Sequence, residues 1–210
     1  MNISFNSVIP IPMSGFVSKS DIWLSNTEFS QNNIYQIVAP SGTGKTSLVH
    51  FLFGIRSDFE GSISFDSKST KDLNYKSWTE LRKNTISIVF QGLRLFPELN
   101  VWENIRIKNK LTGYKTDEQI QLLLERLGLD AHIHKHAGIL SFGQQQRVAL
   151  IRALCQPYEF LLLDEPFSHL DEKLLLLKDR MNTETGRKMA LQRHLFMEHY
   201  LDEFFSEWNG

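Results

Sequence analysis

A loop of small residues between an apolar run and a helical pattern carries the strongest chemical signal in the sequence. Gly42 and Gly44 allow successive backbone N–H groups to turn inward, and the following helix would point its positive end at an anion. Lys45 can reach phosphate oxygens, and Thr46 can offer its hydroxyl to Mg²⁺. The residues predicted to surround a bound phosphate chain are Ala39, Pro40, Ser41, Gly42, Thr43, Gly44, Lys45, Thr46 and Ser47.

One residue departs from the usual form of this loop. The full pattern has glycine at its first position, where this chain has Ala39. On this segment alone, a chance Gly-Lys-Thr before a helix is the alternative. The apolar run at 34–38, which we expect to be a strand, favours the phosphate site because such loops connect a strand to a helix.

A second group of chemical residues follows another apolar run. Residues 160–163 predict a buried strand that ends in Asp164 and Glu165. Alone, this pattern could be a strand with a solvated acidic end. Beside a phosphate loop, Asp164 can hold Mg²⁺ or its water, and Glu165 can polarise an attacking water. Because phosphoryl transfer depends mainly on positioning and charge stabilisation, we predict that Glu165 is the catalytic base.

Residues 140–147, Leu-Ser-Phe-Gly-Gln-Gln-Gln-Arg, stand immediately before an amphipathic helical pattern. One interpretation is a serine that caps the helix, followed by a glutamine-rich first turn. The segment also resembles the signature motif of ATP-binding cassette (ABC) proteins, with Phe142 where the commonest form has glycine. The resemblance implies that Ser141, Gly143 and Gln144 form an anion site, which closes on the γ-phosphate of ATP bound by a second cassette.

Further motifs follow in the order of that family. Gln91, after an apolar run, resembles the Q-loop glutamine, which implies a catalytic role in contact with Mg²⁺ or water. Asp171 resembles the D-loop aspartate, which implies a place near the contact between two cassettes. Phe16 could stack on adenine, with Trp23 as its competitor, and for both a role in the core is the alternative. In finer detail the chain looks most like lipoprotein-release, macrolide-export or cell-division cassettes.

Strands and helices must alternate along the chain to position these groups. Apolar runs predict strands at 3–9, 34–38, 61–65, 86–90 and 160–163, and helical spacing predicts helices at 45–53, 77–83, 117–127 and 144–155. This alternation favours an α/β layer fold. The resemblance adds a P-loop NTPase core, a mainly helical signature subdomain and an antiparallel β edge.

The resemblance covers about residues 1–171, with the helical subdomain at about 92–156. The tail at 172–210 departs from the family, because it contains neither valine nor isoleucine and a strand without them is improbable. The switch histidine that follows this strand in the family is therefore expected to be missing, with His194 and His199 as the nearest candidates. Aromatic residues at helical spacing predict an amphipathic helix in the tail.

Composition excludes several classes of protein. The 24 acidic and 23 basic residues give a net charge of −1, so we expect no nucleic-acid partner. Cys155 is the only cysteine and is predicted to be a small buried residue. No apolar run approaches the roughly 18 residues of a membrane span. A membrane role must therefore act through a partner.

We therefore expect an ATPase subunit of an ABC transporter that uses ATP and Mg²⁺. Its expected partners are a second cassette and a transmembrane permease, which would hold it, as a cytoplasmic protein, on the inner face of the membrane. The alternative is an ATP-gated regulatory or cell-division binding module with weak or no hydrolysis.

Overall fold

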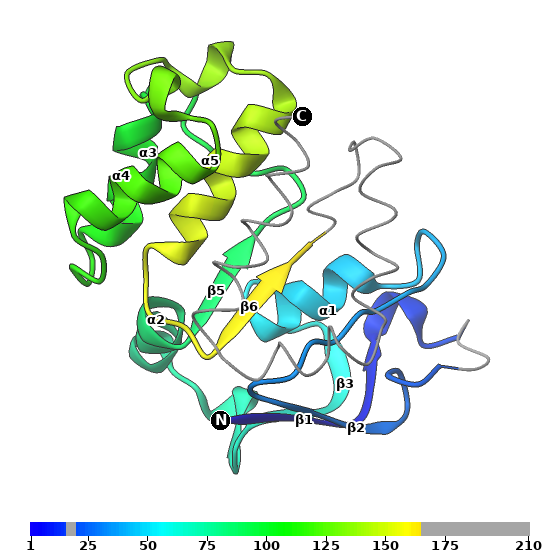
Figure 1. Ribbon diagram of the computed structural model, residues 1–210. Coiled ribbons are helices and arrows are strands. Elements are labelled where there is room, and N and C mark those ends of the chain that lie inside the picture. Colours follow the sequence, from blue (N-terminus) through cyan, green and yellow to red (C-terminus); the bar gives the residue numbers. More distant parts are fainter. Residues whose placement is uncertain (16–19, 165–210) are drawn as a thin grey trace. The chain divides into compact units, whose positions relative to one another are not determined.

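The computed structural model describes residues 1–15 and 20–164 of the 210-residue chain. Contacts divide the chain into two units, Met1–Arg82 and Lys83–Gly210, each with its own arrangement of elements (Figure 1). The predictions at Phe16, Glu165 and Asp171 lie outside the described ranges, as do the tail and its two candidate histidines.

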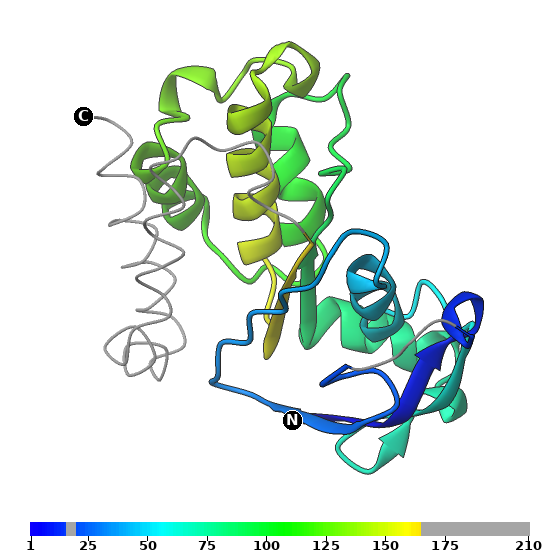
Figure 2. The same ribbon diagram turned by 90° about the vertical axis from the view of Figure 1, so that its right-hand side faces the viewer.

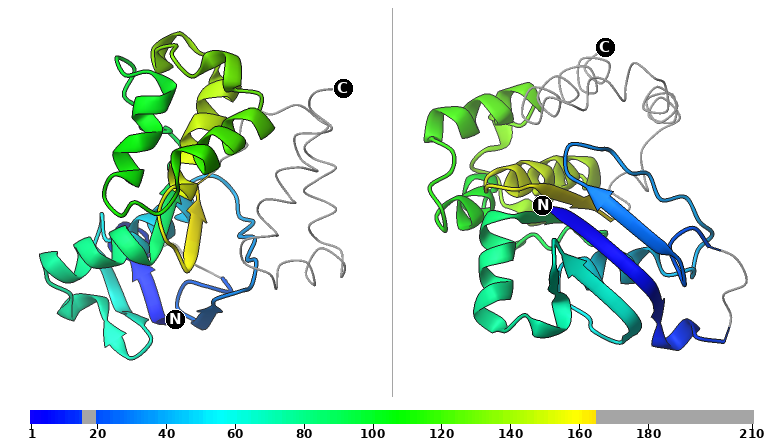
Figure 3. Two further views of the ribbon diagram at one scale, coloured as in Figure 1. Left: turned by 60° about the vertical axis from the view of Figure 1, so that its left-hand side comes forward. Right: turned by 90° about the horizontal axis from the view of Figure 1, so that it is seen from below.

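The first unit contains an antiparallel sheet with the strand order β2-β1-β3-β4 (Figure 3). Alternate side chains are buried at Ile3 and Phe5 of β1 and at Ile63 and Phe65 of β3, as a sheet with one covered face requires. The alternation in β1 ends at the register shift between Asn6 and Ile9. The predicted antiparallel edge is confirmed. The elements are β1 (Asn2–Pro10), the 3₁₀ helix Ile11–Met13, β2 (Asn26–Ser30), α1 (Lys45–Leu52), β3 (Phe59–Phe65), β4 (Lys68–Ser69), the 3₁₀ helix Thr70–Asp72 and α2 (Tyr75–Asn84), which continues into the second unit.

α1 packs through its apolar face, and its end is fixed by a close approach to α2. Phe51 of α1 is 1 % exposed, and its ring centroid lies 4.9 Å from that of Phe59 in β3. After α1 the chain turns at Gly54, where φ is +68°. A Cβ atom on Gly54 would come within 2.5 Å of the Trp78 ring, so only glycine fits between these two elements.

The second unit combines a two-stranded parallel sheet with a cluster of helices (Figure 2). β5 and β6 pair in register from Ile86 opposite Phe160 to Val89 opposite Leu163. The helices share a core formed by Val101, Ile105, Ile120, Leu123, Leu124, Leu127, Val148, Ile151 and Leu154. The elements are β5 (Ile86–Val89), α3 (Val101–Asn109), α4 (Asp117–Arg126), the 3₁₀ helices Asp130–His132 and Ala137–Ile139, α5 (Phe142–Leu154) and β6 (Phe160–Leu163).

The three helices of this unit begin in the same way. Each has a capping box, which starts at Asn100 for α3, at Thr116 for α4 and at Ser141 for α5. In each box the cap side chain accepts a hydrogen bond from the backbone N–H three residues on, and that residue's side chain returns a bond. Local sequence therefore fixes where each helix starts. All three lie within the range 92–156, predicted as a helical subdomain. None of the helices in the described ranges has both the length and the apolar character that crossing a bilayer requires.

The α/β class is confirmed, but one predicted strand is wrong. The run at 34–38 is not a strand, and three of its side chains are exposed: Ile34 at 40 %, Tyr35 at 44 % and Val38 at 78 %. A strand needs a neighbour for its backbone groups, and an apolar run alone does not supply one. Instead, Tyr35 holds the segment to β2: its hydroxyl accepts a hydrogen bond from the Ser30 backbone N–H at 2.9 Å, and its ring packs edge-on against Phe29.

Candidate functional site

The predicted phosphate loop adopts a backbone that its two glycines make possible. Gly42 has φ +79° and Gly44 has φ +91°, both in the left-handed region that side chains disfavour. A Cβ atom on Gly44 would also lie 3.0 Å from Met13 Sδ and 3.0 Å from the Trp23 ring. The Thr43 hydroxyl donates to the Pro40 carbonyl at 2.7 Å and closes the turn. The loop is therefore held in one shape by backbone conformation and by the residues behind it.

Trp23 supports this loop from the core. Its side chain is 7 % exposed and lies edge-on to Phe51, with 6.4 Å between the ring centroids. The indole N–H donates to the Thr43 carbonyl at 2.9 Å. Of the two roles left open for Trp23, the structure places it in the core, where it is not available to stack on adenine. Phe16, its competitor for adenine, lies outside the described residues.

Lys45 begins α1 and bends back over the loop. Its ammonium group donates to the Ala39 carbonyl at 2.7 Å and to the Pro40 carbonyl at 3.0 Å. An α-helix leaves its first backbone N–H groups without intrahelical partners, and Gly44, at the N-cap, has no side chain to cap them. These N–H groups and the adjacent ammonium group suit a polyphosphate, with Thr46 and Ser47 in the same first turn.

The residues predicted to handle Mg²⁺ in the second unit follow two paired parallel strands. Because β5 and β6 run in the same direction, Gln91 and Asp164 both lie just beyond the carboxyl ends of adjacent strands. The Asp164 backbone N–H donates to the Val89 carbonyl at 3.0 Å, which fixes the chain at this end. Asp164 is 3 % exposed. A carboxylate oxygen and an amide oxygen are both ligands that suit Mg²⁺, so the chemistry of these two residues fits the ion. The phosphate loop belongs to the first unit, whereas Gln91 and Asp164 belong to the second, where each follows one of two paired strands.

The predicted signature residues form the start of α5. The Ser141 hydroxyl accepts from the Gln144 N–H at 3.3 Å, and Gln144 Oε1 accepts from the Ser141 N–H at 2.9 Å. The helix-cap interpretation is therefore correct. It is also compatible with anion binding, because Gly143 adds no side chain to the first turn of this helix.

Two residues that contact the predicted site segments were not found by sequence reasoning. His132 lies against the signature helix, with its Nε2 2.7 Å from Gln144 Nε2. Arg152 donates to the carbonyls of Leu93 at 2.6 Å and Arg94 at 2.7 Å, immediately after Gln91. Burial lowers the pKa of Arg152 to about 10, so this side chain remains charged at neutral pH. No spacing rule links these residues to their partners, because the contacts form only in the folded chain.

The part of the chain that matches known proteins includes most of the predicted site residues. A family model described as ABC transporter matches residues 24–168. A spermidine/putrescine import ATP-binding protein of Treponema pallidum (strain Nichols) is 40 % identical over 172 residues, covering 78 % of this chain and 44 % of the relative. The ABC transporter ATP-binding protein YtrE of Bacillus subtilis (strain 168) is 33 % identical over 172 residues, covering 79 % of this chain and 74 % of the relative. The chain thus spans less than half of the first relative's length and about three quarters of the second's.

Solved structures give a similar result. The dimeric structure of MJ0796, a bacterial ABC transporter cassette, matches with a TM-score of 0.71 and 26 % identity, covering 94 % of this chain and 84 % of that one. A post-hydrolysis state of the same cassette, bound to ADP and Pi, matches with a TM-score of 0.67 and 26 % identity, covering 89 % and 85 %. The likeness therefore extends over the fold as well as over the motifs.

Proposed function

The chain belongs to the ABC transporter family, and on this premise we propose that it binds and hydrolyses ATP to drive a membrane transporter. The observation that carries this proposal is the phosphate loop, where left-handed glycines, the start of α1 and the Lys45 ammonium group converge. A transport ATPase is favoured over a regulatory module, because both relatives described above are named as ATP-binding proteins of import or ABC transport systems.

The proposed roles follow the chemistry of each group. When ATP binds, the Lys45 ammonium group would donate to β- and γ-phosphate oxygens in place of the Ala39 and Pro40 carbonyls. Mg²⁺ held by Thr46, Gln91 and Asp164 would neutralise charge that develops on the phosphates. Glu165 polarises the attacking water, which must be oriented in line with the bond that breaks.

A second cassette completes the proposed site. Ser141, Gly143 and Gln144 at the start of α5 would bind the γ-phosphate held by the opposite cassette, and Asp171 would lie near the contact between the two. The dimeric form of the similar solved cassette supports this arrangement. A monomer would leave the signature residues without a ligand, so ATP binding and dimerisation should be linked.

The membrane partner and the cargo are part of the same proposal. A permease subunit would hold the chain at the inner face of the membrane. For the direction of transport, the name of the 40 % identical relative favours import over the lipoprotein release or macrolide export expected from the sequence, and the relatives described above do not include cassettes of those two kinds. A vesicle transport assay with a permease that co-purifies with this chain would decide between these directions.

The first test is MgATP hydrolysis by the full chain, with ATP-dependent dimerisation followed by light scattering. We expect Lys45→Ala to lose ATP binding, and Glu165→Gln to lose at least about 100-fold in turnover while it accumulates as an ATP-bound dimer. Lys76→Ala, which removes an exposed lysine from the same unit, is the control and should behave like the unaltered chain. Dimerisation without hydrolysis in the unaltered chain would instead favour the ATP-gated binding module.

A further inference from the structure

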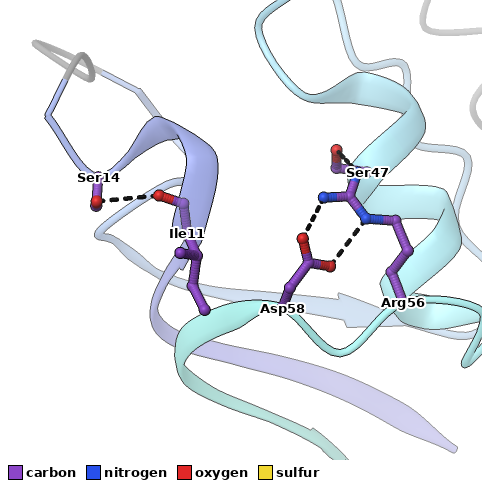
Figure 4. A network of polar contacts seen from close by, with 5 residues as sticks. All are labelled: Ile11, Ser14, Ser47, Arg56 and Asp58. Atoms are coloured by element: carbon purple, nitrogen blue, oxygen red, sulfur yellow. Dashed lines mark hydrogen bonds and ion pairs between the residues drawn. The ribbon is translucent and has the colours of Figure 1, made fainter.

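A clamped arginine connects the first turn of α1 to the segment that follows this helix (Figure 4). Arg56 Nε donates to Asp58 Oδ1 at 2.9 Å, and Arg56 Nη2 donates to Asp58 Oδ2 at 2.5 Å. Its third nitrogen, Nη1, donates to Ser47 Oγ at 2.9 Å. The guanidinium group therefore bridges a carboxylate on one side and a predicted phosphate-binding hydroxyl on the other.

The clamp fixes the guanidinium in one orientation. A two-pronged hydrogen bond to a carboxylate defines both the position and the plane of the group. The guanidinium carbon also lies 5.6 Å from the centroid of the Phe51 ring, on the same helix as Ser47. The hydrogen bond from Arg56 lowers the pKa of Asp58, and the same bond raises the pKa of Arg56, so both groups stay charged at neutral pH.

This contact determines how the Ser47 hydroxyl can be used. A guanidinium group only donates, so Ser47 Oγ must accept from Arg56. The hydroxyl proton is then directed away from Arg56 and is available to an acceptor such as a phosphate oxygen. Ser47 lies in the first turn of α1, two residues after Lys45, where such an oxygen would bind.

The backbone of Asp58 also contacts the segment at 11–14, which precedes Phe16 in the sequence. The Asp58 carbonyl accepts a hydrogen bond from the Ile11 N–H at 3.0 Å. The Ile11 carbonyl in turn accepts from the Ser14 hydroxyl at 3.0 Å (Figure 4). Asp58 is therefore held by its backbone while its carboxylate holds Arg56. The side chains of Arg56 and Asp58 are 34 % and 43 % exposed, so the ion pair itself should add little to stability, and its role here is to orient the guanidinium group.

We propose that Arg56, anchored by Asp58, is a positioning residue for nucleotide binding that orients the Ser47 hydroxyl toward a phosphate of ATP. The proposal rests on the proposed function, because it needs ATP at the phosphate loop. Arg56 does not touch the nucleotide in this scheme. Its effect passes through Ser47, and this dependence can be measured.

The test is a double-mutant cycle on ATP affinity, measured by calorimetry on the full chain. We expect Ser47→Ala and Arg56→Gln each to weaken ATP binding about fivefold to tenfold, and the double variant to be no weaker than either single one. Arg56→Lys keeps the positive charge but lacks the planar guanidinium group that makes paired hydrogen bonds, so the ATP affinity of this variant should stay close to that of Arg56→Gln. Lys71→Gln removes another cation of this unit, one that donates to the Gly61 carbonyl, and should change the affinity less than about twofold.

The possible results distinguish failure of the proposed function, ATP binding, from failure of the positioning role of Arg56. If the unaltered chain does not bind ATP, the proposed function fails and this inference fails with it. If the unaltered chain binds ATP but the effects of Arg56→Gln and Ser47→Ala multiply, or Arg56→Lys restores affinity, only the positioning role is refuted. If Arg56→Gln does not fold, Asp58→Asn, which loosens the guanidinium, replaces it in the cycle with the same expected dependence on Ser47.

Discussion

The indole N–H of Trp23 donates a hydrogen bond to the Thr43 carbonyl at 2.9 Å, so a buried side chain holds the phosphate loop from within the core. The same ring lies 3.0 Å from the point where a Cβ atom on Gly44 would stand. The loop thus has a polar anchor at Thr43 and a tight apolar contact at Gly44. Both constraints keep its N–H groups in the orientation that an anion requires.

Replacing Trp23 with phenylalanine should weaken ATP binding as well as stability. The change removes the donor to the Thr43 carbonyl and part of a buried ring, at an expected cost of about 1–3 kcal/mol in the free energy of unfolding. Urea unfolding and ATP titration measure the two effects. Trp78→Phe is the control, because Trp78 packs on Phe65 in the same unit and should cost stability without changing ATP affinity. Equal losses of affinity in both variants would contradict a specific role for Trp23.

The cap of α5 allows the structural and catalytic roles of Ser141 to be separated. Ser141→Ala should lower the free energy of unfolding by about 1 kcal/mol, because a capping hydroxyl is lost. Thr116→Ala removes the equivalent cap from α4 and should cost a similar amount. Only Ser141→Ala should reduce ATP hydrolysis and ATP-dependent dimerisation. If Thr116→Ala reduces hydrolysis as much, the effect of Ser141 is one of stability.

The elements that could be predicted from sequence are those with strong local signals. The helix that starts at Lys45 follows Gly44, whose left-handed backbone ends the loop without a side-chain cap. The helix that starts at Phe142 follows the serine cap Ser141, whose short-range hydrogen bonds fix its start. The strand at 160–163 is a continuous apolar run, and the strand at 86–89 is apolar except for Ser87; the two become the parallel pair. The positions of Gln91 and Asp164 just past these strands follow from the same pattern.

The elements that could not be predicted depend on partners distant in sequence. β2 has only one residue with a strongly apolar side chain, Phe29, and becomes a strand because β1 pairs with it. The run at 34–38 has the reverse property: it is apolar, but it is not part of a sheet. The bond from Arg56 to Ser47 spans nine residues, and its geometry depends on a turn whose shape the sequence pattern does not specify.

Arg152 should stabilise the turn after Gln91. Leu93 has φ +54° and Arg94 has φ +49°, a strained conformation for two consecutive residues with side chains, and Arg152 donates to both carbonyls. We expect Arg152→Gln to lower the free energy of unfolding by about 1.5–3 kcal/mol, measured by urea unfolding. As a control, Arg106→Gln breaks an exposed pair with Asp117 at 3.9 Å and should cost less than about 1 kcal/mol. Comparable losses in the two variants would show that the turn does not need Arg152.

Cys155 is the only cysteine in the chain, so thiol labelling reports on this one position of the second unit. It is 0 % exposed, as predicted, and burial raises the pKa of its thiol from 9.0 to about 12. At pH 8 the folded chain should therefore react with iodoacetamide far more slowly than the chain in urea, because the thiolate is the reactive form. In the unfolded chain the thiol ionises near pH 9.0, so stability should be unaffected below that pH and fall between about pH 9 and pH 12. The Cys155→Ala variant should lose this part of the pH dependence, and an unchanged profile would contradict the raised pKa.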